Sequence, residues 1–212
     1  MTQRLNDLAV SDLVARLATS DPVPGGGSAS ALAGAMAAAL VEMVVALTVG
    51  RPAAEGHEAE LGRIGSAATD LRTELLRLAE VDADAYAAVV AARRMPKDTD
   101  AERAERAERV RAAVRDATRA PLEVVLRSVE ALTLAESLAP IGNRNAASDV
   151  GVAGLLAAAA IRGAAMNVEI NLPALAQDDD LREEARVAMD AHLADLDARA
   201  HALASAVGER IG

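Results

Sequence analysis

The sequence has 212 residues, of which 52% are hydrophobic, and its 22 basic and 32 acidic residues give a formal net charge of −10. This acidic balance argues against a nucleic-acid partner, which needs a clustered positive surface. The absence of cysteine excludes disulfides and thiolate metal sites, and no basic, apolar leader opens the chain, so we expect one cytoplasmic domain over residues 1–212.

The first predicted helix covers residues 3–18, where leucines recur at helical spacing until Asp21 and Pro22 end the pattern. A loop follows over residues 20–27, with two prolines and three consecutive glycines. Ser28 is a suitable N-cap for the helix after this loop, because its hydroxyl can accept a hydrogen bond from a free N–H of the first turn.

The helix that begins at Ser28 and reaches Gly50 is apolar and long enough to span a bilayer. Its first turns, however, are mostly Ala, Gly and Ser, which gain little from hydrocarbon, and Glu42 would place a carboxylate near mid-span. A charge there costs about 2.5–3.5 kcal/mol on insertion scales. We therefore expect a buried central helix of a soluble bundle, and no membrane partner.

Two long helices are predicted next. The first covers residues 57–94 and must end before Pro96, because proline disfavours helical geometry in the residue that precedes it. The second covers residues 99–138, and its charge-rich beginning is typical of a solvated face with Glu and Arg at helical spacing. Pro121 should kink or divide this second helix, because proline lacks the N–H of a helical residue.

The chain breaks again at Pro140, and Ser148 is a suitable N-cap for a Gly- and Ala-rich helix over residues 149–172. After Pro173, a last helix is predicted over residues 177–207, opened by an acidic run that suits a helix N-terminus and stopped by Gly208. A mostly small-residue stripe on the earlier helix should let another helix pack closely. Its members are Gly151, Gly154, Ala158, Ile161 and Ala165.

Helical periodicity covers nearly the whole chain, and no segment alternates long enough for a strand. The predicted fold class is all-α, an up-and-down bundle of long Ala- and Gly-rich helices. With no Phe or Trp and one Tyr, the core must be built from Ala, Leu, Val, Ile and Met, which requires close contacts between helices. Apolar faces that one subunit can hardly cover predict a homodimer or larger assembly.

The first candidate site is the glycine loop. It delivers the chain into a helix N-terminus, where free N–H groups and the helix dipole favour an anion. It is not a nucleotide P-loop, because no Gly-Lys-Ser/Thr follows the glycines. Glycines needed only for loop geometry are the alternative reading. The residues concerned are Pro24, Gly25, Gly26, Gly27 and Ser28.

A second group of polar residues surrounds the start of the helix at 149. It comprises Asn143, Asn145, Ser148 and Asp149, more polar groups than capping alone would use. Farther along, Asn167 and Asn171 are four residues apart and share a helix face. About 27 Å of helix separates Asp149 from Asn167, so these groups mark two places, or one site completed by another subunit.

The third group lies on the helix over residues 57–94. Asp82 and Tyr86 share a face, whereas Asp84 points elsewhere; solvated carboxylates are the alternative for both aspartates. Tyr86 could stack on a ligand ring or fill a gap in an Ala-rich core. Lys97, the only lysine, either meets a ligand carboxylate or is merely exposed. The three histidines lack metal-ligand spacing, so we expect no metal site.

Together these landmarks resemble, in order, those of the formimidoyltetrahydrofolate cyclodeaminase and methenyltetrahydrofolate cyclohydrolase family. The Pro-Gly-Gly-Gly-Ser helix start and the Asn-Val-Glu-Ile-Asn-Leu segment are the most specific pair. The stretch after Gly50 departs from the pattern, because family members often carry several lysines there and this chain is close to neutral. The landmarks are residues 23–35, 47–48, 82–86, 95–97, 121–122, 143–149 and 167–172.

The resemblance implies a dimerising helical subunit that binds a folate near the glycine loop and needs no cofactor beyond its tetrahydrofolate substrate. It implies chemistry at the N5/N10 one-carbon bridge, through a tetrahedral carbon that needs an acid or base. Asp82 and Asp149 are the catalytic candidates. The favoured reaction is cyclodeamination, which gives 5,10-methenyltetrahydrofolate and ammonia; the alternative is cyclohydrolysis to 10-formyltetrahydrofolate. A non-catalytic, self-associating bundle is an alternative of another class.

Overall fold

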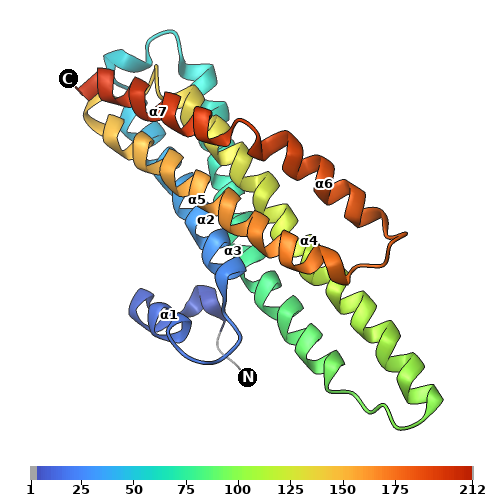
Figure 1. Ribbon diagram of the computed structural model, residues 1–212. Helices are drawn as coiled ribbons and strands as arrows, with labels where there is room; N and C mark the ends of the chain where they lie inside the picture. The colour runs from blue at the N-terminus through green and yellow to red at the C-terminus, as the bar shows by residue number, and fades with distance from the viewer. Residues whose placement is uncertain (1–3, 212) are drawn as a thin grey trace.

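The computed structural model describes residues 4–211, and this part of the chain is almost entirely helical, without a strand. Helix α2 packs against the three other long helices, and α4 also packs against α3 and α5, in the up-and-down arrangement of Figure 1. The predicted all-α bundle is therefore confirmed. The four long helices are α2 (Gly26–Thr48), α3 (Glu58–Arg93), α4 (Asp100–Leu138) and α5 (Ala147–Asn171).

Shorter elements surround this bundle. Helix α1 lies beside the end where α2 begins, and α6 and α7 run along the outside of α4 and α5 (Figure 1). The shorter elements are η1 (Leu5–Asp7), α1 (Val10–Leu17), η2 (Pro52–Ala54), η3 (Arg144–Ala146), η4 (Leu172–Ala174), α6 (Asp180–Leu193) and α7 (Leu196–Ile211).

The core is made of small and aliphatic side chains, and glycine allows the closest helix contacts. A Cβ on Gly34 of α2 would lie 2.7 Å from Oγ of Ser128 on α4. A Cβ on Gly154 of α5 would lie 2.3 Å from Cδ2 of Leu203 on α7. Real side chains do not approach so closely, so the small-residue stripe of α5 is a packing face against α7, as the sequence predicts.

Two predicted helices and both predicted N-caps differ from the structure. In place of one helix over residues 3–18, of which residue 3 lies outside the described range, the chain forms η1 and then α1. The helix predicted over residues 177–207 is two helices that separate around Ala194, with Gly208 inside the second. Both serine caps are wrong as well. Gly25 is the N-cap of α2 and Ala146 that of α5, so Ser28 and Ser148 lie within the first turns.

Two helices pass the length and hydropathy criteria for a membrane span: Gly26–Thr48, and the stretch Arg144–Ala174. In each, roughly half of the most apolar window is buried within the bundle, at 50% and 44% respectively. Core helices of soluble proteins pass the same criteria. The other half of each apolar segment is not buried within the bundle, and what covers it has to be explained separately.

Candidate functional site

The glycine loop ends in a helix start that no side chain of its own segment caps. Gly25 has extended backbone and α2 begins at Gly26, with the first helical hydrogen bond running from the N–H of Ala29 to the carbonyl of Gly25. The N–H groups of the first turn therefore have no intrahelical partner. These N–H groups give the start of the helix a partial positive charge, which favours a negatively charged or hydrogen-bond-accepting group there.

Asp82 of α3 reaches this end of α2. Its Oδ2 lies 3.0 Å from Oγ of Ser28, and the same hydroxyl lies 3.0 Å from the carbonyl oxygen of Ala79. Burial raises the pKa of the Asp82 carboxyl, and hydrogen bonds from the side chain and backbone of Ser28 offset part of that rise. A raised pKa makes a carboxyl a better proton donor and acceptor for catalysis than an ordinary exposed aspartate.

The hydroxyl of Ser28 can donate only one proton, although it has two acceptors within reach. When Asp82 is protonated, its hydroxyl can donate to Ser28, which can then donate to Ala79. When Asp82 is ionised, Ser28 can donate to the carboxylate instead. The serine can therefore follow the protonation state of the acid by rotating its hydroxyl, with no movement of the helices.

Gly27 allows this contact between helices. A Cβ on Gly27 would lie 2.1 Å from Oδ1 of Asp82, so any side chain there would displace the carboxylate. Gly26 is less restricted, since its Cβ would lie 3.5 Å from Nδ2 of Asn167, an ordinary van der Waals distance. The glycines therefore have different roles: Gly27 makes room for the acid, and Gly26 leaves the helix end open.

Two side-chain amides reach the same place from α5. Nδ2 of Asn167 donates to the carbonyl of Gly163, 2.8 Å away, and Nδ2 of Asn171 donates to the carbonyl of Ala117 on α4, also 2.8 Å away. A carbonyl can only accept, which fixes the orientation of both amides. Their Oδ1 atoms remain free to accept hydrogen bonds from a ligand.

The bond from Asn171 also explains why Pro121 does not divide α4. A proline at 121 has no N–H for the carbonyl four residues earlier, which is that of Ala117. Asn171 donates to this carbonyl in place of the missing N–H. The sequence predicts that Pro121 either kinks or divides this helix. The helix is continuous from Asp100 to Leu138, so the predicted division is wrong.

These groups converge on a cavity of about 160 Å³. Tyr86 lines it on the same side of α3 as Asp82, while Asp84 faces two other surface hollows, so the predicted difference in facing is confirmed. The cavity is smaller than most ligand sites, which occupy roughly 300–1,000 Å³, so it fits the reacting part of a ligand. Its lining residues are Pro22, Val23, Gly25, Gly26, Gly27, Asp82, Tyr86, Ala117, Asn167, Ile170 and Asn171.

Several lining residues were not predicted. Ile170 follows Asn167 by three residues and could have been found from helical spacing. Ala117, Pro22 and Val23 carry no polar group that would single them out. Pro24, predicted to bind substrate, is buried and lines a different hollow of about 460 Å³ on the other side of the loop.

The second predicted cluster lies at the opposite end of the bundle. Nδ2 of Asn143 donates to the carbonyl of Leu47, and its backbone N–H donates to Oγ1 of Thr48, both near the end of α2. Helix α2 has 23 residues, so about 33 Å of helix separates this end from the glycine loop. One subunit therefore does not bring Asp149 to Asp82.

Lys97 is exposed in the turn after α3 and is not part of the cavity lining. A larger hollow, about 580 Å³, lies between the end of α4 and α7. Its arginines are already engaged, Arg199 with Glu136 and Arg210 with the carbonyls of Pro140 and Gly142. The 160 Å³ cavity is the better candidate site because its polar groups converge and keep free hydrogen-bonding capacity.

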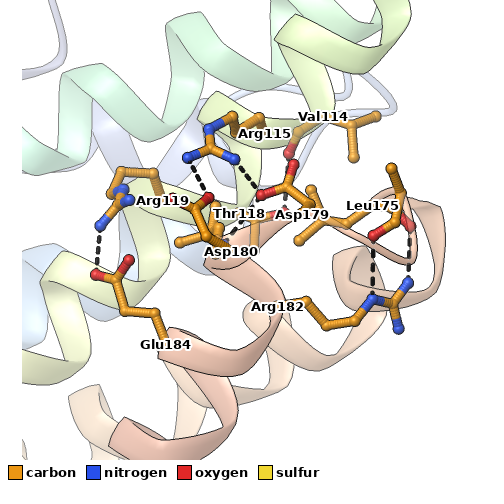
Figure 2. A network of polar contacts seen from close by, with 11 residues as sticks. Val114, Arg115, Thr118, Arg119, Leu175, Asp179, Asp180, Arg182 and Glu184 are labelled. Carbon is orange, nitrogen blue, oxygen red and sulfur yellow. Dashed lines mark hydrogen bonds and ion pairs between the residues drawn. The ribbon is translucent and has the colours of Figure 1, made fainter.

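An ion-pair network holds the segment that follows Asn171. Figure 2 shows Arg115 of α4 between Asp179 and Asp180, and Arg119 beside Glu184 of α6. Asp179 is also the N-cap of α6, accepting from the N–H of Leu181 at 3.0 Å, which confirms the acidic helix start that the sequence predicts. The two arginines of the network lie two residues before and two residues after Ala117, whose carbonyl anchors Asn171.

Comparison with known proteins gives consistent matches. The family model described as formiminotransferase-cyclodeaminase matches residues 9–191. A methenyltetrahydrofolate cyclohydrolase of Methylorubrum extorquens is 43% identical over 171 residues, which are 81% of each chain. A formimidoyltransferase-cyclodeaminase of Rattus norvegicus is 31% identical over 87% of this chain, but the match spans only 34% of the rat protein.

The fold is also matched among solved structures. The structure of a formiminotetrahydrofolate cyclodeaminase from Thermotoga maritima superposes with a TM-score of 0.80 and 28% sequence identity. The match covers 98% of this chain and 97% of that one. The similarity therefore includes the short outer helices as well as the four-helix bundle.

Proposed function

The chain belongs to the formiminotransferase-cyclodeaminase family, and from this premise we propose that it is an enzyme of folate one-carbon metabolism acting at the N5/N10 bridge of a tetrahydrofolate. The single observation that carries a catalytic role is the half-buried Asp82, whose pKa is raised at an open helix end lined by glycine and amide groups. A bundle that served only self-association would have no use for this arrangement.

We place cyclohydrolysis first among the two bridge reactions. The Methylorubrum relative bears the name of a cyclohydrolase, and the match covers the same large share of both chains. Cyclodeamination, which the sequence reading favoured, is the second candidate, supported by the Thermotoga protein that matches along nearly its whole length. In both reactions the one-carbon unit between N5 and N10 becomes a tetrahedral intermediate, so the same site can catalyse either reaction.

In the hydrolytic reaction, ionised Asp82 takes a proton from the attacking water, whose oxygen bonds to the bridge carbon. The bond from that carbon to N5 then breaks as Asp82 returns the proton to N5. The hydroxyl on the carbon loses its remaining proton to solvent and becomes the formyl carbonyl of 10-formyltetrahydrofolate. In the deaminating reaction, N10 bonds to the carbon of the protonated formimino group and passes its own proton to Asp82. The amino nitrogen then leaves as ammonia with a proton from Asp82.

The helix end and the amides would orient the ligand. Free N–H groups at the start of α2 suit a carbonyl or anionic group, while the Oδ1 atoms of Asn167 and Asn171 suit ring N–H and amino donors. Tyr86, exposed to 44%, offers a ring face at the mouth of the cavity. The larger remainder of a folate would lie outside the 160 Å³ cavity.

A paired assay tests the proposal. Purified protein is given 5,10-methenyltetrahydrofolate, with loss of methenyl absorbance as the readout, and separately formimidoyltetrahydrofolate, with ammonia release as the readout. Turnover of the first alone establishes the cyclohydrolase, and turnover of the second alone the cyclodeaminase. Neither turnover nor saturable binding of either folate would contradict the proposed function and favour the scaffold.

We also propose that the protein is a soluble homodimer. The support is the outward half of α2 and α5, which is apolar but belongs to helices otherwise packed in the core. A core helix with one open apolar side fits an interface between subunits better than a membrane span, which would be apolar on all sides.

A further inference from the structure

Pro121 lies in the interior of α4 without interrupting it. The helix is continuous from Asp100 to Leu138, and Pro121 is buried within it. Proline is the least favourable residue inside a helix, because it has no N–H for the carbonyl four residues earlier and its ring crowds that carbonyl. Here the carbonyl is that of Ala117, which lines the candidate cavity. The proline therefore leaves an acceptor without its helical donor beside the candidate site.

Asn171, at the end of α5, supplies a donor to this carbonyl. Its Nδ2 lies 2.8 Å from the carbonyl oxygen of Ala117. An asparagine carries a donor and an acceptor of nearly the same size, so its orientation is set by whichever partners distinguish the two. A carbonyl without a helical donor distinguishes them strongly, because Oδ1 turned toward it would leave two acceptors in contact. Oδ1 of Asn171 is thereby kept away from Ala117, as an acceptor for the cavity that Asn171 lines.

Asn167, one turn earlier on α5, is held differently. Its Nδ2 lies 2.8 Å from the carbonyl oxygen of Gly163. That carbonyl is four residues earlier in the same helix, where it is the regular acceptor for the backbone N–H of Asn167. The acceptor is therefore satisfied whichever way the side chain turns, and it selects the orientation of Asn167 less strongly. Of the two amides, Asn171 is the one whose orientation depends on another helix.

The backbone after Asn171 is held to the same stretch of α4. Arg115 and Arg119, on either side of Ala117, pair with acidic residues at the start of α6 (Figure 2). Arg182 of α6 in turn donates to the carbonyl of Leu175 at 2.7 Å, which ties the segment between α5 and α6 to α6. The arginines thus hold the chain near the end of α5, and the carbonyl of Ala117 decides how the amide at that end is turned.

We propose that Pro121 is a positioning residue of the candidate site: by withholding a donor from the carbonyl of Ala117, it makes Asn171 present Oδ1 to the cavity as a fixed acceptor. The ligand group selected is a hydrogen-bond donor, such as a ring N–H or an amino group of a nitrogen heterocycle. For the identity of the ligand this inference rests on the proposed function, since the pterin ring of a folate carries such donors. A ligand edge with an acceptor at this place is rejected, because two acceptors would then face each other.

The orientation of Asn171 can be measured by NMR without any ligand. The chain has five asparagines and two glutamines, so an isotope-labelled sample gives few side-chain NH₂ signals, and the pair that is lost in Asn171→Ala belongs to Asn171. In the wild type we expect these protons to exchange slowly with water. In Pro121→Ala, residue 121 gives its own N–H to the carbonyl of Ala117, so the exchange should become several-fold faster. Equal protection in both proteins would overturn the proposal.

Steady-state kinetics tests what the fixed acceptor does for the ligand. With the folate that the wild type turns over, Pro121→Ala should raise KM by about 2–10-fold, the range that one hydrogen bond between neutral groups contributes. The value of kcat should change little, because the bond to the ring donor is present before and during the reaction. In an Asn171→Ala background, Pro121→Ala should add no further rise, since the proline acts through the amide. An equal rise in both backgrounds, or a fall in kcat alone, would contradict the positioning role.

Controls separate this role from a general effect on the fold. Pro52→Ala removes an exposed proline beyond the far end of α2 and should leave both the exchange and KM as in the wild type. Pro121→Val also supplies an N–H and keeps more of the buried volume, so it must give the same result as Pro121→Ala.

The two measurements also separate the positioning role from the proposed function. If the wild type turns over neither folate but the Asn171 amide is released in Pro121→Ala, the proposed function fails and the orientation by Pro121 stands. If a folate is turned over but the amide stays equally protected, the orientation by Pro121 is wrong and the folate function stands.

Discussion

Asp82 is subject to two opposing influences that the structure separates. Burial disfavours its ionised form, and the hydroxyl and N–H of Ser28 favour it; burial is the larger influence, so the pKa of the carboxyl is raised. Asp84, two residues away, is exposed on another side of the helix. This difference between neighbouring aspartates makes a matched pair of variants possible.

Replacing Asp82 by Asn keeps the size of the side chain but removes its charge and its proton transfer. We expect turnover to fall by about 10²–10⁴ if Asp82 is the acid or base, whereas Asp84→Asn should lose much less. The measurement is steady-state kinetics of both variants, each checked for a retained fold by thermal unfolding. An equal, small loss in both would place Asp82 among ordinary surface carboxylates.

The raised pKa of Asp82 also predicts how stability depends on pH. A carboxyl whose pKa is higher in the folded than in the unfolded protein stabilises the fold fully only below its unfolded pKa. That contribution is lost as the pH rises through the folded pKa. Asp82→Asn, which is always neutral, should therefore melt at a higher temperature than wild type at neutral pH. The gain should shrink on acidification, and a gain that is the same at every pH would contradict this explanation.

At the scale of elements, the start of α2 tests the roles of two adjacent glycines. Gly26→Val should weaken folate binding far more than it lowers the melting temperature, because it adds bulk where a ligand approaches free N–H groups. Gly27→Ala should instead lower turnover and stability together, since its Cβ would overlap the Asp82 carboxylate. Calorimetric binding and thermal unfolding of both variants distinguish them. Wild-type affinity in Gly26→Val would remove the loop from the site.

The link between α4 and α5 can be measured by a double-mutant cycle. Asn171→Ala leaves the buried carbonyl of Ala117 without a partner, which should cost about 1–3 kcal/mol of unfolding free energy. In a Pro121→Ala background, residue 121 has an N–H to donate to that carbonyl, so the same substitution should cost less. The measurement is denaturant unfolding of the four proteins. Strictly additive effects would show that the proline and the asparagine are independent.

The sequence predicts α3, α4 and α5 within a few residues because Pro96 and Pro140 mark local breaks that no tertiary contact overrides. It fails at the start of α2, where Ser28 lies within the first turn and its hydroxyl contacts Asp82, a residue 54 positions away. It also fails between α6 and α7, where Leu193-Ala194-Asp195 contains no glycine or proline as a signal.

The candidate site was predictable only in part for the same reason. Helical spacing alone places Tyr86 beside Asp82 and Asn171 beside Asn167. The packing of the helices, and not the sequence pattern, brings these two pairs to the glycine loop. The packing also places Asp149 at the other end of α5, away from the loop. The anchoring of Asn171 on Ala117 could have been suspected from Pro121, since a proline within a helix leaves one carbonyl in need of a donor.

At the scale of the whole molecule, the outward apolar halves of α2 and α5 give a simple prediction. The protein should be recovered in the soluble fraction without detergent and should have the mass of a dimer at micromolar concentration. Light scattering of the purified protein measures that mass. A monomer under these conditions would contradict the dimer, and recovery only with detergent would favour a membrane bundle.

The lack of Phe and Trp has a practical consequence for solution work. Tyr86 is the only Phe, Trp or Tyr side chain of the protein, and it lines the cavity. Nearly all intrinsic ultraviolet fluorescence of the protein therefore arises at the candidate site, with no background from the core. A ligand that stacks on Tyr86 should quench this emission, so its binding can be titrated without a label. The same signal will report the opening of the site, and melting of the helical bundle must be followed separately by circular dichroism.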